Sequence, residues 1–573
     1  MGLKEMFGAS GARREPAAMP ESGHVVDTSS RDVRVPEKVT EHVLVDSTKG
    51  VVYVDRNHSH DPEIRTWIHR RTRESELVIE EVDATEMAVL KAKARTESSS
   101  AVVDDEENRF KSRVKDMLYR AARNGASDVH IQVRQNDTVV HFVVDGESRL
   151  AESMTQHEGS RALKTIYQGI APTSDSSYLP RENQNAQIPG DVFPAEAGLT
   201  SIRVVKGPCY PQDQNGEFMT LRMQYSGGSR RRHSENEKLP YPPKPEGEYR
   251  LPSMGFDAKQ IEALDELMAV PEGLILFVGP TGSGKTTSIY EFLSEMTRRK
   301  PYKRVITVED PVEIPIPTAV QMSVTNAQDK ESTAKAYQGA VRTMLRMAPR
   351  IILIGELRDE DVAALAMEAG VTGHTVVTTL HVDESFQWVD RLETMGTGKL
   401  KRQAFCDPKR IRGVITQRIL SHLCQHCAKR LSELPEVPRS HRLAVEALTT
   451  WGDISNVRLR GDGCESCHQS GVAGRYAIAE VIKTDRDLMR DFVEHGTVIA
   501  RQNYQARPDS ERPMIERAIE MVLNGRVDPV TVEDNIDVIP RREKASRKPH
   551  LVGGMDAEQS DDRLAAGILG VGT

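Results

Sequence analysis

Long apolar runs are missing from this 573-residue sequence. No window approaches the roughly 20 apolar residues that a membrane-spanning helix needs, and residues 1–14 lack the apolar core of a secretory signal. Aromatic residues make up only 5% of the chain, and 85 acidic residues exceed 77 basic ones to give a formal charge of −8. We therefore expect no basic, aromatic-lined groove for nucleic acid, and we predict a cytoplasmic protein.

Cysteine is also scarce, with six residues in the whole chain. Cys209 and Cys406 stand alone, and the other four form two C-x-x-C pairs, which is more typical of metal binding in a reducing compartment than of disulfides. The paired residues are Cys424, Cys427, Cys464 and Cys467. Four thiolates can hold a tetrahedral Zn²⁺ and leave no open coordination position, so we predict a structural zinc site. A redox pair or unliganded cysteines are the alternatives.

Composition divides the chain into several modules, because 573 residues are too many for one core. Residues 1–30 and the stretch around 96–107 are rich in small, polar and charged types, which is typical of tails and linkers. The predicted units are a disordered tail at 1–30, a small α+β module at 31–95, an α+β domain at 105–225, a linker at 226–250, an α/β core at 251–423, a tetracysteine module at 424–480, a helical region at 481–540 and a disordered tail at 541–573.

Hydrophobic periodicity predicts the elements upstream of the linker. The small module has predicted strands at 42–45 and 51–54 and helices at 64–74 and 84–93. The second domain has a predicted amphipathic helix from residue 108 to the Asn124-Gly125 stop signal, followed by strands at 129–133, 139–144, 202–205 and 219–223. No role for the small module can be read from its residues.

Beyond residue 251, short apolar runs alternate with helical patterns. The runs are 274–278, 305–308, 351–354 and 375–379. Continuous apolar strands between helices are typical of a largely parallel sheet that helices cover on both faces. We therefore predict an α/β fold for this part of the chain.

The strongest motif follows the first of these strands and precedes a helix. It matches G-x-x-x-x-G-K-[ST], a loop whose backbone N–H groups surround the phosphates of a nucleotide. The expected nucleotide-binding residues are Gly279, Pro280, Thr281, Gly282, Ser283, Gly284, Lys285, Thr286 and Thr287. Lys285 would reach the β and γ phosphates and Thr286 would offer its hydroxyl to Mg²⁺. We predict ATP and Mg²⁺ as cofactors.

Carboxylates stand at the ends of two other predicted strands. Glu356 follows the strand at 351–354, so it would reach the sheet edge and act in the Mg²⁺ shell. Glu309 and Glu313 follow the strand at 305–308, and either could orient or deprotonate the attacking water. We place Glu313 first and Glu309 second. The alternative for Glu356 is an ordinary surface acid.

His374 and His381 bracket the predicted strand at 375–379. A single histidine is more often a structural residue than a catalytic one. Two histidines around a strand that ends near the γ-phosphate are candidate phosphate sensors.

Together these motifs resemble the secretion ATPases that drive type II secretion and type IV pilus assembly. Beside the P-loop, the matches are an acidic box at 308–313, a Walker B motif at 355–359, a histidine box at 372–381, the four cysteines and the segment 474–480. The resemblance extends from about residue 108 to about residue 535. It implies a RecA-like P-loop core with an inserted zinc-binding module, which hydrolyses ATP as a homohexamer. It also implies a peripheral position on the inner membrane, through a platform protein of a pilus or secretion system.

The upstream domain resembles the PAS-like α+β domain of that family at 126–131 and 143–146. By this resemblance Arg203 and Arg222 would reach the γ-phosphate, and the 226–250 linker would be the hinge between domain and core. Two segments depart from the family pattern: 181–187 replaces an Asp-Gly-Arg turn, and 348–350 replaces an acidic approach to Walker B. These departures indicate a divergent member, such as a plasmid-borne or type IVB pilus variant.

Three other functions fit part of the sequence. A retraction or DNA-transfer motor would share the ATPase core, but the cysteine module favours assembly, because retraction motors of this family typically lack it. A nucleotide-dependent regulatory switch with little turnover is disfavoured, because Glu356 and Glu313 are both present. A RecA-like nucleic-acid motor is disfavoured by the acidic balance and the few aromatic residues.

Overall fold

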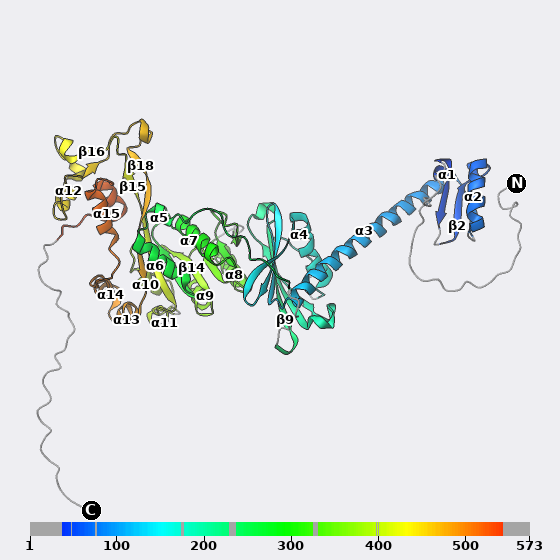
Figure 1. The fold of residues 1–573 in the computed structure, drawn as a ribbon, viewed down its shortest axis with the longest axis horizontal. Coiled ribbons are helices and arrows are strands. Elements are labelled where there is room, and N and C mark those ends of the chain that lie inside the picture. Colours follow the sequence, from blue (N-terminus) through cyan, green and yellow to red (C-terminus); the bar gives the residue numbers. More distant parts are fainter. Residues whose placement is uncertain are drawn as a thin grey trace, which may run out of the picture.

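The computed structural model divides into three parts along its length (Figure 1). A small module and a central sheet domain are joined by a long helix, and the α/β core follows with the C-terminal modules. The structure describes residues 37–46, 49–74, 77–172, 177–228, 237–324, 330–396, 398 and 400–542. The two predicted tails, at 1–30 and 541–573, lie outside these residues except for 541 and 542.

The N-terminal module is a three-stranded sheet with two helices. Its elements are α1 (Glu37–His42), β1 (Val43–Asp46), β2 (Val51–Asp55), α2 (Pro62–Glu74) and β3 (Val78–Val82). Strand β2 lies in the centre, antiparallel to β1 and parallel to β3. The first two strands and α2 match the predicted elements. The sequence did not reveal β3, because two glutamates stand in the middle of this five-residue strand.

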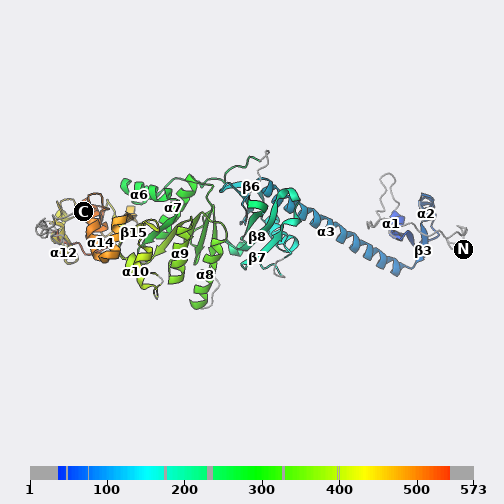
Figure 2. The ribbon, with the colours of Figure 1, turned by 90° about the horizontal axis from the view of Figure 1, so that it is seen from below.

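Helix α3 (Ala84–Arg123) is 40 residues long and spans the distance from this module to the central domain (Figure 2). The stretch around 96–107, which we expected to be tail or linker, is part of this helix. Alanine, glutamate, lysine and arginine are good helix formers, but a largely polar segment has no clear apolar stripe to reveal it. The last turns do carry a stripe, and Val114, Leu118 and Ala121 are buried against the central domain.

The central domain contains six antiparallel strands in the order β6-β5-β4-β9-β8-β7. The strands are β4 (Asp128–Val133), β5 (Asp137–Val144), β6 (Glu147–Thr155), β7 (Gln184–Pro189), β8 (Leu199–Pro208) and β9 (Glu217–Tyr225). Helix α4 (Gln156–Lys164), its π-helical continuation (Thr165–Ile170) and the end of α3 share one apolar core with this sheet. The two strands that the sequence did not predict, β6 and β7, are the edge strands, and their exposed side chains weaken the apolar pattern.

The α/β core has a seven-stranded sheet in the order β12-β11-β13-β14-β10-β15-β18. The strands are β10 (Gly273–Val278), β11 (Val305–Glu309), β12 (Ala319–Ser323), β13 (Ile351–Ile354), β14 (Thr375–Leu380), β15 (Ile411–Leu423) and β18 (Val472–Lys483). The pairings are parallel except that β18 runs antiparallel to β15. The predicted parallel arrangement of the four apolar strands is therefore confirmed.

Helices cover both faces of this sheet, as the apolar strands require. Leu274 and Leu276 of β10 belong to a core that includes helices α8 (Lys330–Leu345) and α9 (Glu360–Val371). Ile275 and Phe277 belong to a second core that includes α6 (Ala258–Ala269) and α7 (Lys285–Arg299). Alternate residues of one strand thus enter opposite cores, which explains why the whole strand is apolar. The short helices α5 (Leu251–Met254), α10 (Trp388–Thr394) and α11 (Arg402–Phe405) complete this part.

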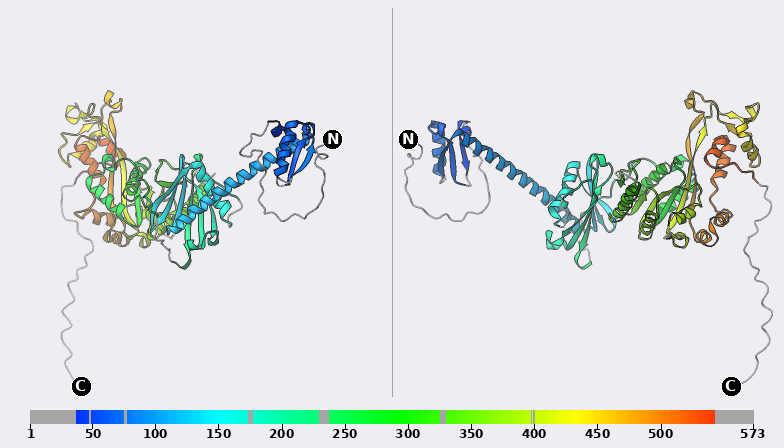
Figure 3. Two further views of the ribbon diagram at one scale, coloured as in Figure 1. Left: turned by 45° about the vertical axis from the view of Figure 1, so that its right-hand side comes forward. Right: turned by 180° about the vertical axis from the view of Figure 1, so that it is seen from behind.

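Strands β15 and β18 continue beyond the sheet and carry the cysteine module at their far ends (Figure 3). That module also contains β16 (Lys429–Arg430), β17 (Arg458–Leu459) and α12 (Arg442–Leu448). The chain closes with α13 (Arg486–Glu494), α14 (Gly496–Gln505), α15 (Met514–Leu523) and α16 (Pro529–Asn535). Within the described ranges, no helix combines the length and the apolarity needed to cross a membrane.

The central domain contacts the core where the parallel strands begin and along the edge strand β12, whose Gln321 carbonyl oxygen accepts a hydrogen bond from the backbone N–H of Tyr210 at 2.7 Å. The backbone N–H of Ser148 donates to the carbonyl oxygen of Tyr302 at 3.0 Å, and Arg304 donates to the Thr220 hydroxyl at 3.0 Å. The predicted linker is partly anchored to the same domain, since the Arg149 guanidinium lies 3.8 Å from the centre of the Tyr241 ring. Residues 229–236 of this linker, which include three consecutive arginines, lie outside the described residues.

Candidate functional site

The P-loop connects β10 to α7 through three glycines with positive φ angles. These angles are 143° at Gly279, 81° at Gly282 and 83° at Gly284. Space is limiting at two of these positions, because a Cβ at Gly279 would lie 2.6 Å from the carbonyl oxygen of Gln417 and one at Gly284 would lie 2.7 Å from its Nε2. Glycine is therefore required both for the backbone conformation and for the close approach of β15.

Lys285 begins helix α7 and is buried inside the loop. Its Nζ donates to the carbonyl oxygens of Gly279 at 2.8 Å and Pro280 at 2.9 Å. Burial lowers the pKa of Lys285, and the nearby negative charges of Glu356 and Glu313 act in the opposite direction. The ammonium group thus lies against the loop that the motif assigns to phosphate, beside the half-buried Thr286 and the exposed Thr287.

Gln417 of β15 is a part of this site that the motifs did not reveal. Its Nε2 donates to the carbonyl oxygen of Ser283 at 2.8 Å, and the side chain is buried. The hydroxyl of Ser283 and the Oε1 of Gln417 are both buried without a hydrogen-bond partner in the described part of the chain. Gln417 therefore supports the P-loop from the neighbouring strand.

Glu356 lies just beyond the end of β13 and meets a residue from the end of the adjacent strand β14. Its Oε1 is 3.4 Å from Nε2 of His381, and its Oε2 accepts a hydrogen bond from Nε of Arg358 at 2.9 Å. Arg358 also donates to Asp310 of the acidic box at 2.6 Å. The structure thus joins the acidic box, the Walker B motif and the histidine box at one edge of the sheet.

The two acidic-box glutamates differ in their surroundings. Glu309 is buried and accepts hydrogen bonds from the hydroxyls of Tyr290 and Thr307 and from the Gln321 amide. Glu313 is exposed and close enough to Lys285 to oppose the lowering of its pKa. The described contacts hold Glu309 between β11, β12 and α7, whereas Glu313 faces solvent near the P-loop.

The structure does not bring the two predicted histidine sensors together. His374 precedes β14 and His381 follows it, so a six-residue strand separates them by about 20 Å. The Nδ1 of His374 is 3.0 Å from the carbonyl oxygen of Ala369, and burial lowers its pKa. His374 lies in a cavity with Arg350 and Arg222, between the core and the central domain. Only His381 of the pair is near Glu356.

Arg203 and Arg222 are exposed neighbours on β8 and β9, directly opposite each other in the register. Nε of Arg222 donates to Asp128 at 3.0 Å. Both arginines line a cavity that includes Arg346, beyond the end of α8. Within one chain they therefore face the edge where the core strands begin, and the structure does not bring them to the P-loop.

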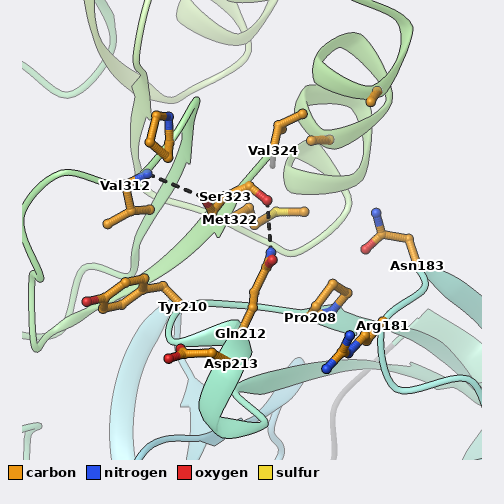
Figure 4. A pocket seen from close by; sticks show the side chains of 13 residues that line it. Arg181, Asn183, Pro208, Tyr210, Gln212, Asp213, Val312, Met322, Ser323 and Val324 are labelled. Carbon is orange, nitrogen blue, oxygen red and sulfur yellow. Dashed lines mark hydrogen bonds between the residues drawn. The ribbon is translucent and has the colours of Figure 1, made fainter. Parts of the chain in front are cut away.

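A separate pocket lies between the central domain and the acidic-box loop (Figure 4). Arg181 lines it from the segment that departs from the family pattern, and Val312 lines it from the acidic box. Gln212 closes one side by donating to the carbonyl oxygen of Ser323 at 2.8 Å. An arginine of this divergent segment therefore shares a pocket with the acidic-box loop.

The four predicted zinc ligands meet at the end of the β15 and β18 arms. All four sulfurs lie within 4.8 Å of one another, and the closest pairs are separated by 3.7 to 3.8 Å. These residues are Cys424, Cys427, Cys464 and Cys467. Four sulfurs placed about 2.3 Å from one tetrahedral ion would be about 3.8 Å apart, so the donor set fits zinc without rearrangement.

Backbone hydrogen bonds favour the thiolate form of one of these cysteines, Cys467. The Sγ of Cys467 accepts hydrogen bonds from the backbone N–H groups of Cys464 and Gly471, each at 3.2 Å. Burial alone would raise the pKa of Cys467, but these hydrogen bonds, together with those to the thiols of Cys464 and Cys427, lower it to about 6. The pKa of Cys427 is raised instead, by burial and by the neighbouring sulfurs. Metal ligation requires the thiolate form, and the backbone favours it here.

A P-loop between β10 and α7, with acidic residues at the ends of β11 and β13, defines the class of P-loop ATP-binding proteins. The chain belongs to the Type II/IV secretion system protein family, whose profile matches residues 244–538. This match covers the core, the cysteine module and the C-terminal helices.

The curated relatives carry names from the same family. The chain is 29% identical over 413 residues to the type IV pilus assembly ATPase PilB of Thermus thermophilus, an alignment that covers 72% of this chain and 41% of that protein. It is 29% identical over 409 residues to the type II secretion system protein HxcR of Pseudomonas aeruginosa, covering 71% of this chain and 73% of that protein. Among solved structures, the pilus retraction motor PilT with bound ADP matches at 18% identity and a TM-score of 0.36, covering 73% of this chain and 96% of that one.

Proposed function

We propose that this chain is the ATPase motor of a type IV pilus assembly or type II-like secretion system. The observation that carries the proposal is the position of Glu356, at the end of β13 with His381 beside it and the P-loop two strands away. The names of the relatives support the same activity. The core would be of the RecA-like type and the central domain of the PAS-like type.

Each site residue would have a distinct part in hydrolysis. Lys285 and the P-loop N–H groups would hold the phosphates, and Thr286 with Glu356 would hold Mg²⁺. Glu313 would orient or deprotonate the attacking water, because its carboxylate is exposed beside the P-loop, while Glu309 is already occupied by three donors. His381 would report the loss of the γ-phosphate through Glu356.

A ring of six subunits would complete the site. Arg203 and Arg222 lie far from the P-loop of their own chain, so they would reach the γ-phosphate of a neighbouring subunit. Their guanidinium groups would neutralise charge that develops on the phosphate during hydrolysis. His374 would then act in the contact between the central domain and the core.

Zinc and a membrane partner belong to the same proposal. The four cysteines would hold one structural Zn²⁺ and keep the end of the β15 and β18 arms folded.

The motor would act at the cytoplasmic face of the inner membrane through a platform protein, with no nucleic acid required. The cysteine module favours assembly over the retraction or DNA-transfer alternatives.

Steady-state Mg-ATP hydrolysis across a range of protein concentrations tests this function. Turnover per subunit should rise as rings form, and Lys285→Ala should abolish it. Tight ATP binding without turnover at any concentration would instead favour a nucleotide-dependent switch. Concentration-independent turnover would contradict the proposed ring.

A further inference from the structure

The N-terminal module brings two histidines onto one carboxylate oxygen. His42 ends α1, Asp55 ends β2, and His58 lies in the 3₁₀ turn that follows β2. The Nδ1 atoms of His42 and His58 each lie 3.3 Å from Oδ2 of Asp55. The two imidazole rings are stacked, with centroids 3.6 Å apart and planes 14° apart. These three residues come from three different elements, so the fold itself assembles the cluster.

The spacing of the three donor atoms fits a common metal ion. An N–H···O hydrogen bond is usually about 2.9 to 3.0 Å long, so 3.3 Å is long for both contacts. Nitrogen and oxygen ligands placed about 2.1 Å from one ion at a tetrahedral angle lie about 3.4 Å apart. The ligand atoms of His42, Asp55 and His58 all lie within 4.8 Å of one another. An imidazole binds a metal ion near its own ring plane, so the stacked rings would have to turn apart, and the more exposed His58 has room to do so.

The side chain of Asp55 is fixed in position by its surroundings. Asp55 is only 5% exposed, and its Oδ1 accepts a hydrogen bond from the backbone N–H of Asn57 at 3.0 Å. This hydrogen bond fixes the side chain and leaves Oδ2 for the histidines, as outer hydrogen bonds do in protein metal sites. The side chain of His58 is 42% exposed, which gives an ion a path from solvent.

The small size of the module gives the ion a structural purpose. Among the described residues, the buried apolar core contains seven side chains, namely Val39, Val43, Val45, Val52, Val54, Ile64 and Ile68. Domains of fewer than about 70 residues often need a disulfide or a metal to be stable. All views place this module at the far end of α3, away from the central domain and the core (Figures 1 to 3).

We propose that His42, Asp55 and His58 bind one divalent transition-metal ion of the zinc type. Two imidazoles and one carboxylate suit zinc and its first-row neighbours better than Mg²⁺, which prefers oxygen ligands. Three protein donors leave one position of a tetrahedral ion open to water. This site is distinct from the four cysteines, so the chain binds two zinc ions at two separate modules.

Zinc content of the full-length protein tests the proposal. After saturation with Zn²⁺ and removal of loosely bound metal, elemental analysis should give two zinc ions per chain. His58→Ala, a change at a half-exposed side chain, should lower this to one, and Cys464→Ser should also leave one. His60→Ala is the matched control, because His60 is exposed on the same loop and is not among the three donors, and it should keep two.

The outcomes separate the two zinc sites. Unchanged zinc in His58→Ala, or equal loss in His60→Ala, overturns the proposed donor set. If the zinc content falls in His58→Ala and does not change in Cys464→Ser, the site in the N-terminal module is supported and the cysteines are not zinc ligands. As a second readout, Zn²⁺ should slow proteolysis of the N-terminal module in wild-type protein and in His60→Ala. Protection by Mg²⁺, or equal protection of His58→Ala by Zn²⁺, would contradict a zinc site here.

Discussion

Glu356 and His381 meet at the ends of adjacent parallel strands, with 3.4 Å between Oε1 of the carboxylate and Nε2 of the imidazole. The contact links a residue of the Walker B motif with one of the histidine box. The segment after His381 leads to α10.

The first prediction concerns Glu356. Glu356→Gln should retain ATP binding and lower the rate of hydrolysis by about 10²- to 10⁴-fold, because the amide keeps the shape of the side chain and loses its charge. Nucleotide binding and turnover should be measured on the same preparation. Normal turnover in this variant would show that the Walker B assignment is wrong.

The second prediction separates the two acidic-box glutamates. Glu313→Gln should lower turnover and leave the melting temperature unchanged, because Glu313 is exposed. Glu309→Gln should lower the stability of the core by about 1–3 kcal/mol, because it disturbs a buried group that accepts three hydrogen bonds. Thermal unfolding and ATP turnover of both variants show which glutamate acts in catalysis and which stabilises the core. The reverse pattern would make Glu309 the residue that prepares the water.

The sequence predicted those helices and strands whose own residues carry a clear hydrophobic pattern. The strand before the P-loop is apolar at every position because both faces of the sheet are covered, and the glycines follow from the loop conformation. Strand β3 and the edge strands β6 and β7 were missed because their exposed faces carry polar residues. The middle of α3 was missed because it has no clear apolar stripe.

The site was harder to predict where it depends on contacts between distant segments. Gln417 supports Ser283 across 134 positions of the sequence, and nothing near Gln417 marks it as part of the loop. The burial of Glu309 likewise results from contacts with α7 and β12. The predicted strand between His374 and His381 is present as β14, so the sequence already placed the two histidines at its opposite ends, and only His381 lies near Glu356.

The third prediction concerns Gln417. Gln417→Ala should leave the Ser283 carbonyl without its partner and weaken ATP binding by about 1–3 kcal/mol, which corresponds to about a 5- to 150-fold rise in Kd. Titration of a fluorescent ATP analogue measures the effect. Unchanged affinity in Gln417→Ala would show that β15 does not support the loop.

The control for this prediction is Gln224→Ala in the central domain. Strand β15 contains no second glutamine, so a matched amide has to come from another strand. Gln224 of β9 uses its side-chain amide in a similar way, since its Oε1 accepts a hydrogen bond from the Ser201 hydroxyl at 2.6 Å. Gln224→Ala should therefore lose a local hydrogen bond and leave ATP affinity unchanged.

The fourth prediction concerns the cysteine cluster. Removal of zinc by a chelator should increase hydrogen exchange in residues 424–471, because structural zinc supplies part of the folding free energy of such modules. The apolar core around α12 and α15 should keep the rest of this region folded. Cys406→Ser is the control, because Cys406 lies outside the cluster, and its exchange should match that of wild-type protein. Exchange that does not respond to the chelator would count against a structural metal.

The fifth prediction concerns the pH dependence of the central domain. His130 of β4 is only 2% exposed, and neither ring nitrogen has a hydrogen-bond partner within the ranges that the structure covers. Burial lowers the pKa of His130 well below its ordinary value, and the positive charge of Arg304 adds to this effect. The folded protein therefore keeps His130 neutral at a pH where the unfolded chain would bind a proton.

The sign of the effect follows from this difference in proton binding. Below the ordinary histidine pKa of about 6.5 the unfolded state binds more protons, so the free energy of unfolding falls as the pH falls, by up to about 1.4 kcal/mol per pH unit. His130→Leu should remove this contribution, whereas His157→Leu, at an exposed histidine of the same domain, should keep it. Hydrogen exchange of the β4 amides, corrected for intrinsic rates, measures the stability at about pH 7.5 and about pH 5.5. Burial also lowers the pKa of His141, the partner of His130 on β5, to about 3, and both variants keep this second contribution. If the His130→Leu and His157→Leu proteins lose the same stability over this interval, His130 does not couple folding to protons.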